Sequence, residues 1–259
     1  SEFRFKSLLN KPVDKPVNKP LNKPLNKPVV DKSIKKIYIY SRVFTKFCAE
    51  NFKSYFDSLN IECTLLMRNI NSQDIDECNK DPNLYFFIIG PQYIIHFSKV
   101  NTLPNNKYIL YQIEQLNQTF NTMNKLNNIS HLLENSYAIF DYTTINLQYY
   151  PDNIRERVKL LVPLIKEPQF EVIEEEINNK ESEEETPLIL FIGIINERRE
   201  KILNKLKDKG YNLKIVSKVF GDELVDEIKK CDIVINLHYY DNAILEIFRI
   251  HDLLPYDCK

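Results

Sequence analysis

The sequence lacks any apolar segment that could cross a membrane. A spanning helix needs about 20 consecutive apolar residues, and no run in the 259 residues approaches that length. The first ten residues, SEFRFKSLLN, also lack the apolar core of a signal peptide. We therefore expect a cytoplasmic protein with no membrane span.

Glycine is scarce, with only four residues in the chain, and none of them forms a glycine-rich motif. The dinucleotide-binding pattern GxGxxG is absent, and so is the P-loop pattern GxxxxGK[S/T]. These absences argue against an ordinary dinucleotide-binding protein and against a P-loop enzyme.

The chain also lacks an excess of charge and any pairing of cysteines. Its 35 lysines and arginines balance 36 aspartates and glutamates, so we expect no nucleic-acid partner. The five cysteines include no CxxC pair and no ordinary zinc spacing. We interpret them as reduced structural thiols and expect no metal site.

What the sequence does contain, near its start, is a repeat of Lys-Pro-apolar-Asn/Asp over residues 11–30. Proline at every fourth position excludes helix and removes backbone donors, so we predict an extended spacer. A ligand for a proline-reading module is the alternative, although a strict PxxP is missing. The opening tripeptide SEF indicates a tag remnant left by cloning or an excision from a longer protein. We therefore expect residues 1–35 to be a linker with a tag remnant, and we expect a further domain upstream of it in the full-length protein.

Apolar runs then alternate with helical patterns over residues 36–168, which is typical of a parallel sheet covered on both faces. We predict one Rossmann-like domain in this range. The predicted strands are residues 36–41, 61–67, 83–90, 107–116, 137–143 and 158–164. The predicted helices are residues 45–60, 126–136 and 145–150, with a short helix or loop at 93–100.

A second α/β pattern fills residues 187–259, after a glutamate-rich segment at 169–186 that we interpret as a solvated interdomain linker. The predicted strands are residues 187–194, 211–217 and 232–238, and the predicted helices are residues 196–210, 220–231 and 243–254. These are fewer strands than a complete doubly wound domain uses. We therefore expect the second domain to be truncated at its C-terminus.

Ligands of open parallel sheets bind at the carboxyl ends of the strands. In the second domain this rule selects Gly193, which lets a phosphate approach the backbone, and Arg198 and Arg199 at a helix N-terminus that favours anions. Together they could hold a diphosphate. A glycine required by a turn and two arginines on a solvated helix face remain the alternative.

In the first domain the same rule selects Glu114 and Asp141. Either carboxylate could act as a general base for a hydroxyl acceptor, and a loop carboxylate bonded to neighbouring backbone is the alternative for each. His96 and His131 lie among apolar helical positions, so we interpret both as packing residues.

Five motifs carry a resemblance to a known family. They are YQIEQL (111–116), FDYTTIN (140–146), FIGIINERREKIL (191–203), VFGDEL (219–224) and INLHYYDNAILEIFRIHDLL (235–254). In this order the motifs resemble GT-B glycosyltransferases of the broad family 1 and family 4-like group. The resemblance covers roughly residues 36–259, with Thr143 where the family usually has Ser.

The resemblance implies two Rossmann-like domains that face each other across a cleft, with the nucleotide-sugar donor on the second and a glycan or protein acceptor on the first. Many such enzymes have a Glu-x7-Glu motif at the donor site. Glu246 fits the second glutamate, which contacts the ribose, whereas His238 stands where the first would be. Because of this departure, a retaining mechanism cannot be carried over.

The resemblance also implies that Tyr239 lies near the sugar. It implies further that Arg198 or Arg199 neutralises the negative charge of the diphosphate leaving group without a metal ion. The nucleotide-sugar is then a co-substrate, and no cofactor is expected. A non-catalytic nucleotide- or sugar-binding module is the alternative, and so is a structural domain that only presents surfaces.

Overall fold

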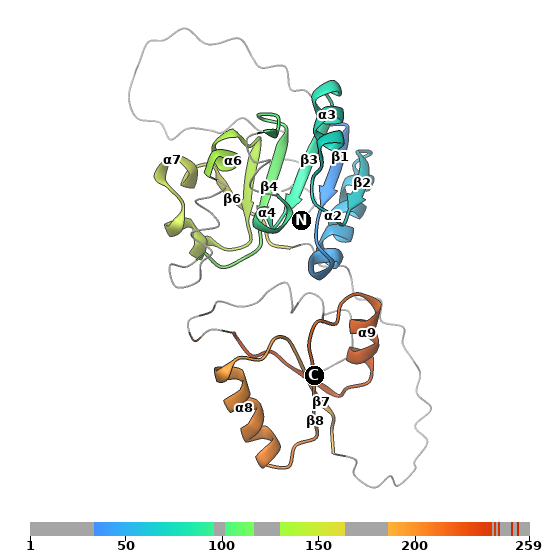
Figure 1. The fold of residues 1–259 in the computed structure, drawn as a ribbon, viewed down its shortest axis with the longest axis vertical. Coiled ribbons are helices and arrows are strands. Elements are labelled where there is room, and N and C mark those ends of the chain that lie inside the picture. Colours follow the sequence, from blue (N-terminus) through green and yellow to red (C-terminus); the bar gives the residue numbers. More distant parts are fainter. Residues whose placement is uncertain are drawn as a thin grey trace.

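The computed structural model describes most of the two predicted α/β regions (Figure 1). The described residues are 34–95, 102–116, 130–163 and 186–239, together with the single residues 241, 243, 250 and 253. The Lys-Pro repeat and most of the glutamate-rich segment therefore lie outside the described residues.

The first α/β region forms a six-stranded parallel sheet, as predicted. Its strands are β1 (Lys36–Tyr40), β2 (Glu62–Leu66), β3 (Leu84–Ile89), β4 (Tyr108–Gln112), β5 (Ala138–Asp141) and β6 (Val158–Leu160). Their order is β2-β1-β3-β4-β5-β6. The chain therefore moves outward from β1 to β2 and returns on the other side of β1, which puts the switch point between β1 and β3.

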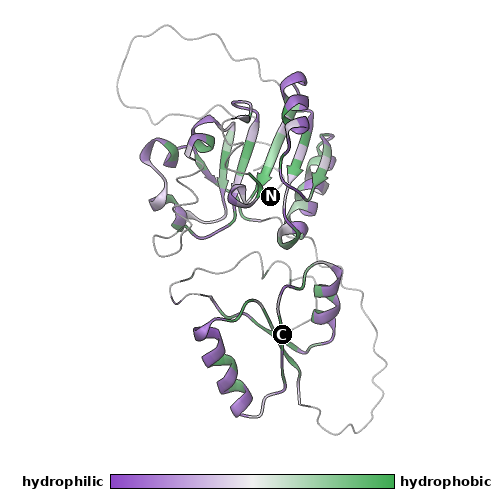
Figure 2. Ribbon diagram, in the orientation of Figure 1, coloured by the Kyte–Doolittle hydropathy of each residue, from purple (hydrophilic) through white to green (hydrophobic). Residues whose placement is uncertain are grey.

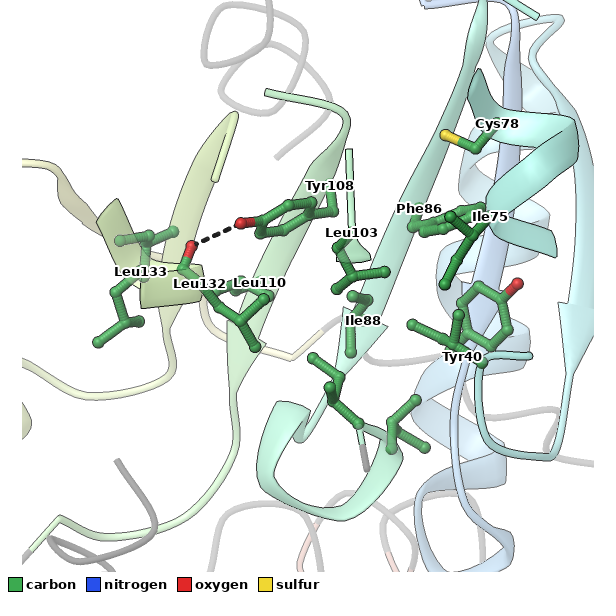
Figure 3. Packing of buried hydrophobic residues seen from close by; sticks show 14 of the residues in the cluster. Tyr40, Ile75, Cys78, Phe86, Ile88, Leu103, Tyr108, Leu110, Leu132 and Leu133 are labelled. Carbon is green, nitrogen blue, oxygen red and sulfur yellow. Dashed lines mark hydrogen bonds between the residues drawn. The ribbon is translucent and has the colours of Figure 1, made fainter. Parts of the chain in front are cut away.

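Alternate side chains of each strand enter different cores on the two faces of this sheet. Phe86 belongs to one apolar cluster and its neighbour Phe87 to the other, because successive strand residues point to opposite faces. Figure 3 shows the first cluster, in which the Tyr108 hydroxyl donates to the Leu132 carbonyl over 3.1 Å. Both faces are buried, which explains the uninterrupted apolar runs in the sequence.

Helices cover both faces. The elements around the first sheet are η1 (Val43–Thr45), α2 (Lys46–Ser58), α3 (Ser72–Lys80), α4 (Pro91–Ile94), α6 (Ser130–Asn135), η3 (Thr144–Tyr149) and α7 (Asp152–Arg155). Phe52 and Phe56 of α2 lie in one cluster, and Ile75 and Cys78 of α3 lie in the other. The predicted cover on both sides is therefore confirmed.

Several local predictions need correction. Helices α3 and α7 were not predicted at all, and the segment expected to be helical at 145–150 is the 3-10 helix η3. His131 is exposed on α6, so its interpretation as a packing residue is wrong. His96 lies outside the described residues.

The second α/β region forms a three-stranded parallel sheet of order β8-β7-β9. Its elements are β7 (Ile189–Ile192), α8 (Glu197–Asp208), β8 (Leu213–Val216), α9 (Asp222–Lys229) and β9 (Ile233–Ile235). This order repeats that of the first three strands of the larger sheet. Apolar strands and helices with polar outer faces are visible in both regions (Figure 2). The helix predicted for 243–254 falls largely outside the described residues.

Across the residues that the structure describes, none of the helices combines the length and the apolar character that membrane crossing requires.

Candidate functional site

The carboxyl edge of the second sheet begins with a turn that leads from β7 into α8. Gly193 has a φ of 148°, a backbone conformation that L side chains rarely adopt, and its N–H donates to the Val216 carbonyl over 2.9 Å. The Asn196 side chain then caps α8 by accepting from the Arg199 N–H over 2.9 Å. The glycine and the cap together fix where the helix begins.

Arg199 is buried, with 2% of its surface exposed. Its Nε and Nη2 donate to the Leu237 carbonyl over 2.9 and 2.6 Å, and Nη1 donates to the Ile194 carbonyl over 2.7 Å. The guanidinium also lies 5.3 Å from the ring of Phe191 and 5.1 Å from that of Tyr239. Arg199 therefore fastens the loop after β7 to the segment after β9.

Two further side chains of the same turn bind that segment. Arg198 Nη1 donates to the His238 carbonyl over 2.6 Å, and Arg198 Nε pairs with Asp241 Oδ1 at 2.5 Å. Asn196 Nδ2 donates to the Tyr239 carbonyl over 2.6 Å. Since the Asp241 carboxylate is 85% exposed and the Arg198 side chain 34%, this ion pair is accessible to an incoming anion.

The structure thus brings most of the predicted donor-site residues to one edge of the second sheet. They are Gly193, Arg198, Arg199, His238 and Tyr239. His238 is half-buried, and its Nδ1 has no hydrogen-bond partner among the described residues. Glu246 lies outside the described residues, so its predicted contact with the ribose stays a prediction.

At the carboxyl edge of the first sheet, Asp141 is buried with 1% of its surface exposed. Its carboxylate accepts from the Thr143 N–H over 3.0 Å, from Asn146 Nδ2 over 3.0 Å to each oxygen, and from the Tyr150 hydroxyl over 2.9 Å. Burial raises the pKa of Asp141 to about 6, although these hydrogen bonds act in the opposite direction. The geometry favours the structural alternative for this carboxylate.

The YQIEQL and FDYTTIN motifs bind each other through the same network. Asn146 Nδ2 also donates to the Glu114 carbonyl over 2.9 Å, and Asn146 Oδ1 accepts from the Leu116 N–H over 2.8 Å. Gln112 Nε2 reaches the same Glu114 carbonyl over 3.1 Å. These contacts hold the loop after β4 against the loop after β5, which gives both motifs a structural role.

The Glu114 side chain belongs to a different group, close to the switch point. Its Oε1 accepts from the Tyr93 hydroxyl over 2.9 Å. The Tyr93 carbonyl in turn accepts from Arg42 Nε and Nη2 over 3.0 and 2.6 Å, and Arg42 Nη2 donates to Asn69 Oδ1 over 2.5 Å. Polar groups from the ends of β1, β2, β3 and β4 therefore converge here.

Sequence reasoning missed Arg42 and Asn69 in this group. The signal that could have found Arg42 is its position two residues after β1, where the carboxyl-end rule applies as it does to Glu114. Gly90, at the end of β3, has a φ of 64°, and a Cβ there would stand 2.9 Å from Ile113 Cδ1. Because glycine tolerates this left-handed backbone and has no Cβ to clash with Ile113, β3 turns directly into α4, which carries Tyr93.

Two glutamines at this edge carry buried polar atoms that lack partners. Gln112, 4% exposed, has no hydrogen-bond donor to its Oε1 in the part of the chain that the structure describes, and neither carboxamide atom of Gln92 has a partner there. A buried polar group left in this state costs about 1–3 kcal/mol. A ligand that offers hydroxyl groups would recover part of that cost.

Within the described ranges, no three or more His, Cys, Asp or Glu side chains are grouped so that they could hold a metal ion. Comparison of the sequence with protein-family models gave no match, and comparison with curated proteins also gave none.

Proposed function

We propose that the protein is a glycosyltransferase that moves a sugar from a nucleotide-sugar to a hydroxyl acceptor, with two Rossmann-like domains facing across a cleft in the GT-B manner. The observation that carries this proposal is the gathering of the predicted donor-site residues at the carboxyl edge of the second sheet. That edge is where open parallel sheets bind their ligands.

The chemistry of the donor side explains why these residue types suit the reaction. Breaking the bond between the anomeric carbon and the phosphate oxygen leaves a nucleoside diphosphate with new negative charge. Arg198 is half-exposed, and a phosphate could displace Asp241 from its guanidinium. The N-terminus of α8 adds a favourable dipole. His238 and Tyr239 are then the side chains beside the sugar, and Glu246 holds the ribose.

On the acceptor side, Glu114 is the stronger candidate for the general base. It is half-buried and is oriented by the Tyr93 hydroxyl, whereas Asp141 is enclosed by its own network. The unmatched carboxamide oxygen of Gln112 offers a hydrogen-bond acceptor to a neutral hydroxyl compound. We therefore favour a carbohydrate hydroxyl as the acceptor.

The test is calorimetric titration with UDP, GDP and ADP and with their sugar conjugates, followed by an assay for release of free sugar or its transfer. We expect one nucleoside diphosphate to bind and Glu246→Ala to weaken that binding at least tenfold. Glu134→Ala, which removes an exposed glutamate on α6 of the first α/β region, is the control and should bind like wild type. Failure of all three nucleotides to bind would reject the proposal.

A second candidate is a nucleotide- or sugar-binding module without turnover. The observation in its favour is that Asp141 and Arg199 are both used in structural contacts, which leaves fewer groups for catalysis. Tight nucleotide binding with neither hydrolysis nor transfer of the sugar, across a panel of glycan and peptide acceptors, would favour this candidate.

A further inference from the structure

We infer that side chains at the start of α8 hold residues 237–239, here called the 237–239 segment, in the position that a bound nucleotide requires. Asn196 and Arg199 then affect nucleotide binding only through this segment. The inference rests on the proposed function and deepens it. The family resemblance implies that Arg198 or Arg199 neutralises the diphosphate, and the inference assigns Arg199 to a structural contact within this chain instead.

Three side chains at the start of α8 donate hydrogen bonds to three successive backbone carbonyls, one side chain to each carbonyl. Arg199 holds the carbonyl of Leu237, Arg198 that of His238, and Asn196 that of Tyr239, over 2.6 to 2.9 Å. Consecutive carbonyls of an extended strand alternate in direction, so three that bind the same helical turn require a bent backbone. The side chains of Asn196, Arg198 and Arg199 stabilise that bend.

The burial of Arg199 favours a structural role over contact with a ligand. A buried guanidinium needs several partners to offset its lost hydration, and Arg199 obtains them from the Leu237 and Ile194 carbonyls and from the faces of Phe191 and Tyr239. With 2% of its surface exposed, it offers little area to a ligand. Its charge instead strengthens the hydrogen bonds to the backbone.

Asn196 has two separable roles, which makes the inference testable. Its Oδ1 accepts from the Arg199 N–H as the helix cap, and its Nδ2 donates to the Tyr239 carbonyl. Asn196→Asp retains the first contact, since Asp caps helices as well as Asn does. It loses the second contact, because a carboxylate has no N–H to donate.

For Asn196→Asp we expect the melting temperature to stay within about 3 °C of wild type, because the cap is retained. Amide hydrogen exchange at residues 237–239 should become about tenfold faster, and the affinity for the nucleoside diphosphate that wild type binds should fall by about tenfold, since one hydrogen bond to the segment is lost. Asn204→Asp, on an exposed position of α8, is the control and should change neither quantity.

Arg199→Lys separates charge from geometry. A lysine keeps the positive charge but cannot bind the Leu237 and Ile194 carbonyls at once as the guanidinium fork does. If Arg199 positions the 237–239 segment, amide hydrogen exchange at these residues rises and nucleotide affinity falls. If its charge contacts the diphosphate directly, exchange stays as in wild type, and this result would overturn the inference.

Failure of the inference is distinguishable from failure of the proposed function. Unchanged nucleotide affinity in Asn196→Asp, with or without faster exchange, overturns the inference alone. Absence of nucleotide binding in wild type overturns the proposed function and the inference with it.

Discussion

At the residue scale, Asp141 is a carboxyl group that folding removes from water. Its pKa rises from an ordinary 3.8 to about 6, with burial as the main cause. Between these values the folded chain keeps a proton that the unfolded chain has released, so the folded state binds more protons. The contribution of Asp141 to stability is therefore greatest below pH 4 and is lost as the pH rises to about 6.

We predict that Asp141→Asn removes this pH-dependent contribution, because an amide does not titrate. Urea unfolding midpoints of both proteins measured from pH 4 to pH 7 check it, with the difference between the two curves isolating residue 141 from other titrating groups. The wild-type midpoint should fall relative to the variant from pH 4 to about pH 6 and then run parallel to it up to pH 7. Parallel curves throughout would show that the carboxyl group titrates in its ordinary range.

At the element scale, the strands were predictable and helices α3 and α7 were not. Strands β3 and β4 at the centre of the first sheet are apolar runs in which every residue is buried, which is typical of a sheet covered on both faces, whereas the edge strands β2 and β6 are only partly buried. Helix α3 buries only Asp74, Ile75 and Cys78 in nine residues, too few for a clear helical period. The sequence nevertheless contains the signal for the start of α3, a capping box formed by Asn71 and Asp74. The side chain of each residue accepts a hydrogen bond from the backbone N–H of the other over 2.9 Å.

We predict that Asn71→Ala destabilises the protein by about 1 kcal/mol, because the Asp74 N–H loses its acceptor at the start of α3. Gln73→Ala, at an exposed position in the same turn, should change the free energy of unfolding by less than about 0.5 kcal/mol. Urea denaturation of both variants measures the difference. Equal stability of the two would mean that the cap contributes nothing and that packing alone fixes this helix.

At the scale of the whole molecule, the sequence predicts which edge of each sheet carries polar residues but not what those residues bind. The strand-end rule correctly located Arg198, Arg199 and Glu114 at carboxyl edges. It could not foresee that Arg199 binds the Leu237 carbonyl, 38 positions away in the chain. Such partners depend on how separate strands come together, and residue type and spacing do not contain that information.

The carboxyl edges of both sheets also expose apolar side chains, and this bears on the proposed cleft. Phe44 follows β1 with 41% of its surface exposed, and Ile194 and Ile195 follow β7 with 60% and 45% exposed. If the two edges close over a nucleotide, burying these side chains contributes to the closed state at roughly 25 cal/mol per Å² of apolar surface. Tyr211, 51% exposed at the amino end of β8, would stay in solvent.

We predict that the radius of gyration, measured by small-angle X-ray scattering, decreases when a saturating nucleoside diphosphate is added. Ile194→Ser should reduce this decrease, because it removes apolar surface from the closing edge, whereas Tyr211→Ser should leave it as in wild type. An unchanged wild-type radius at full occupancy would contradict closure. An equal effect of the two variants would mean that surface hydrophobicity in general, rather than the carboxyl edge of the second sheet, governs the compaction.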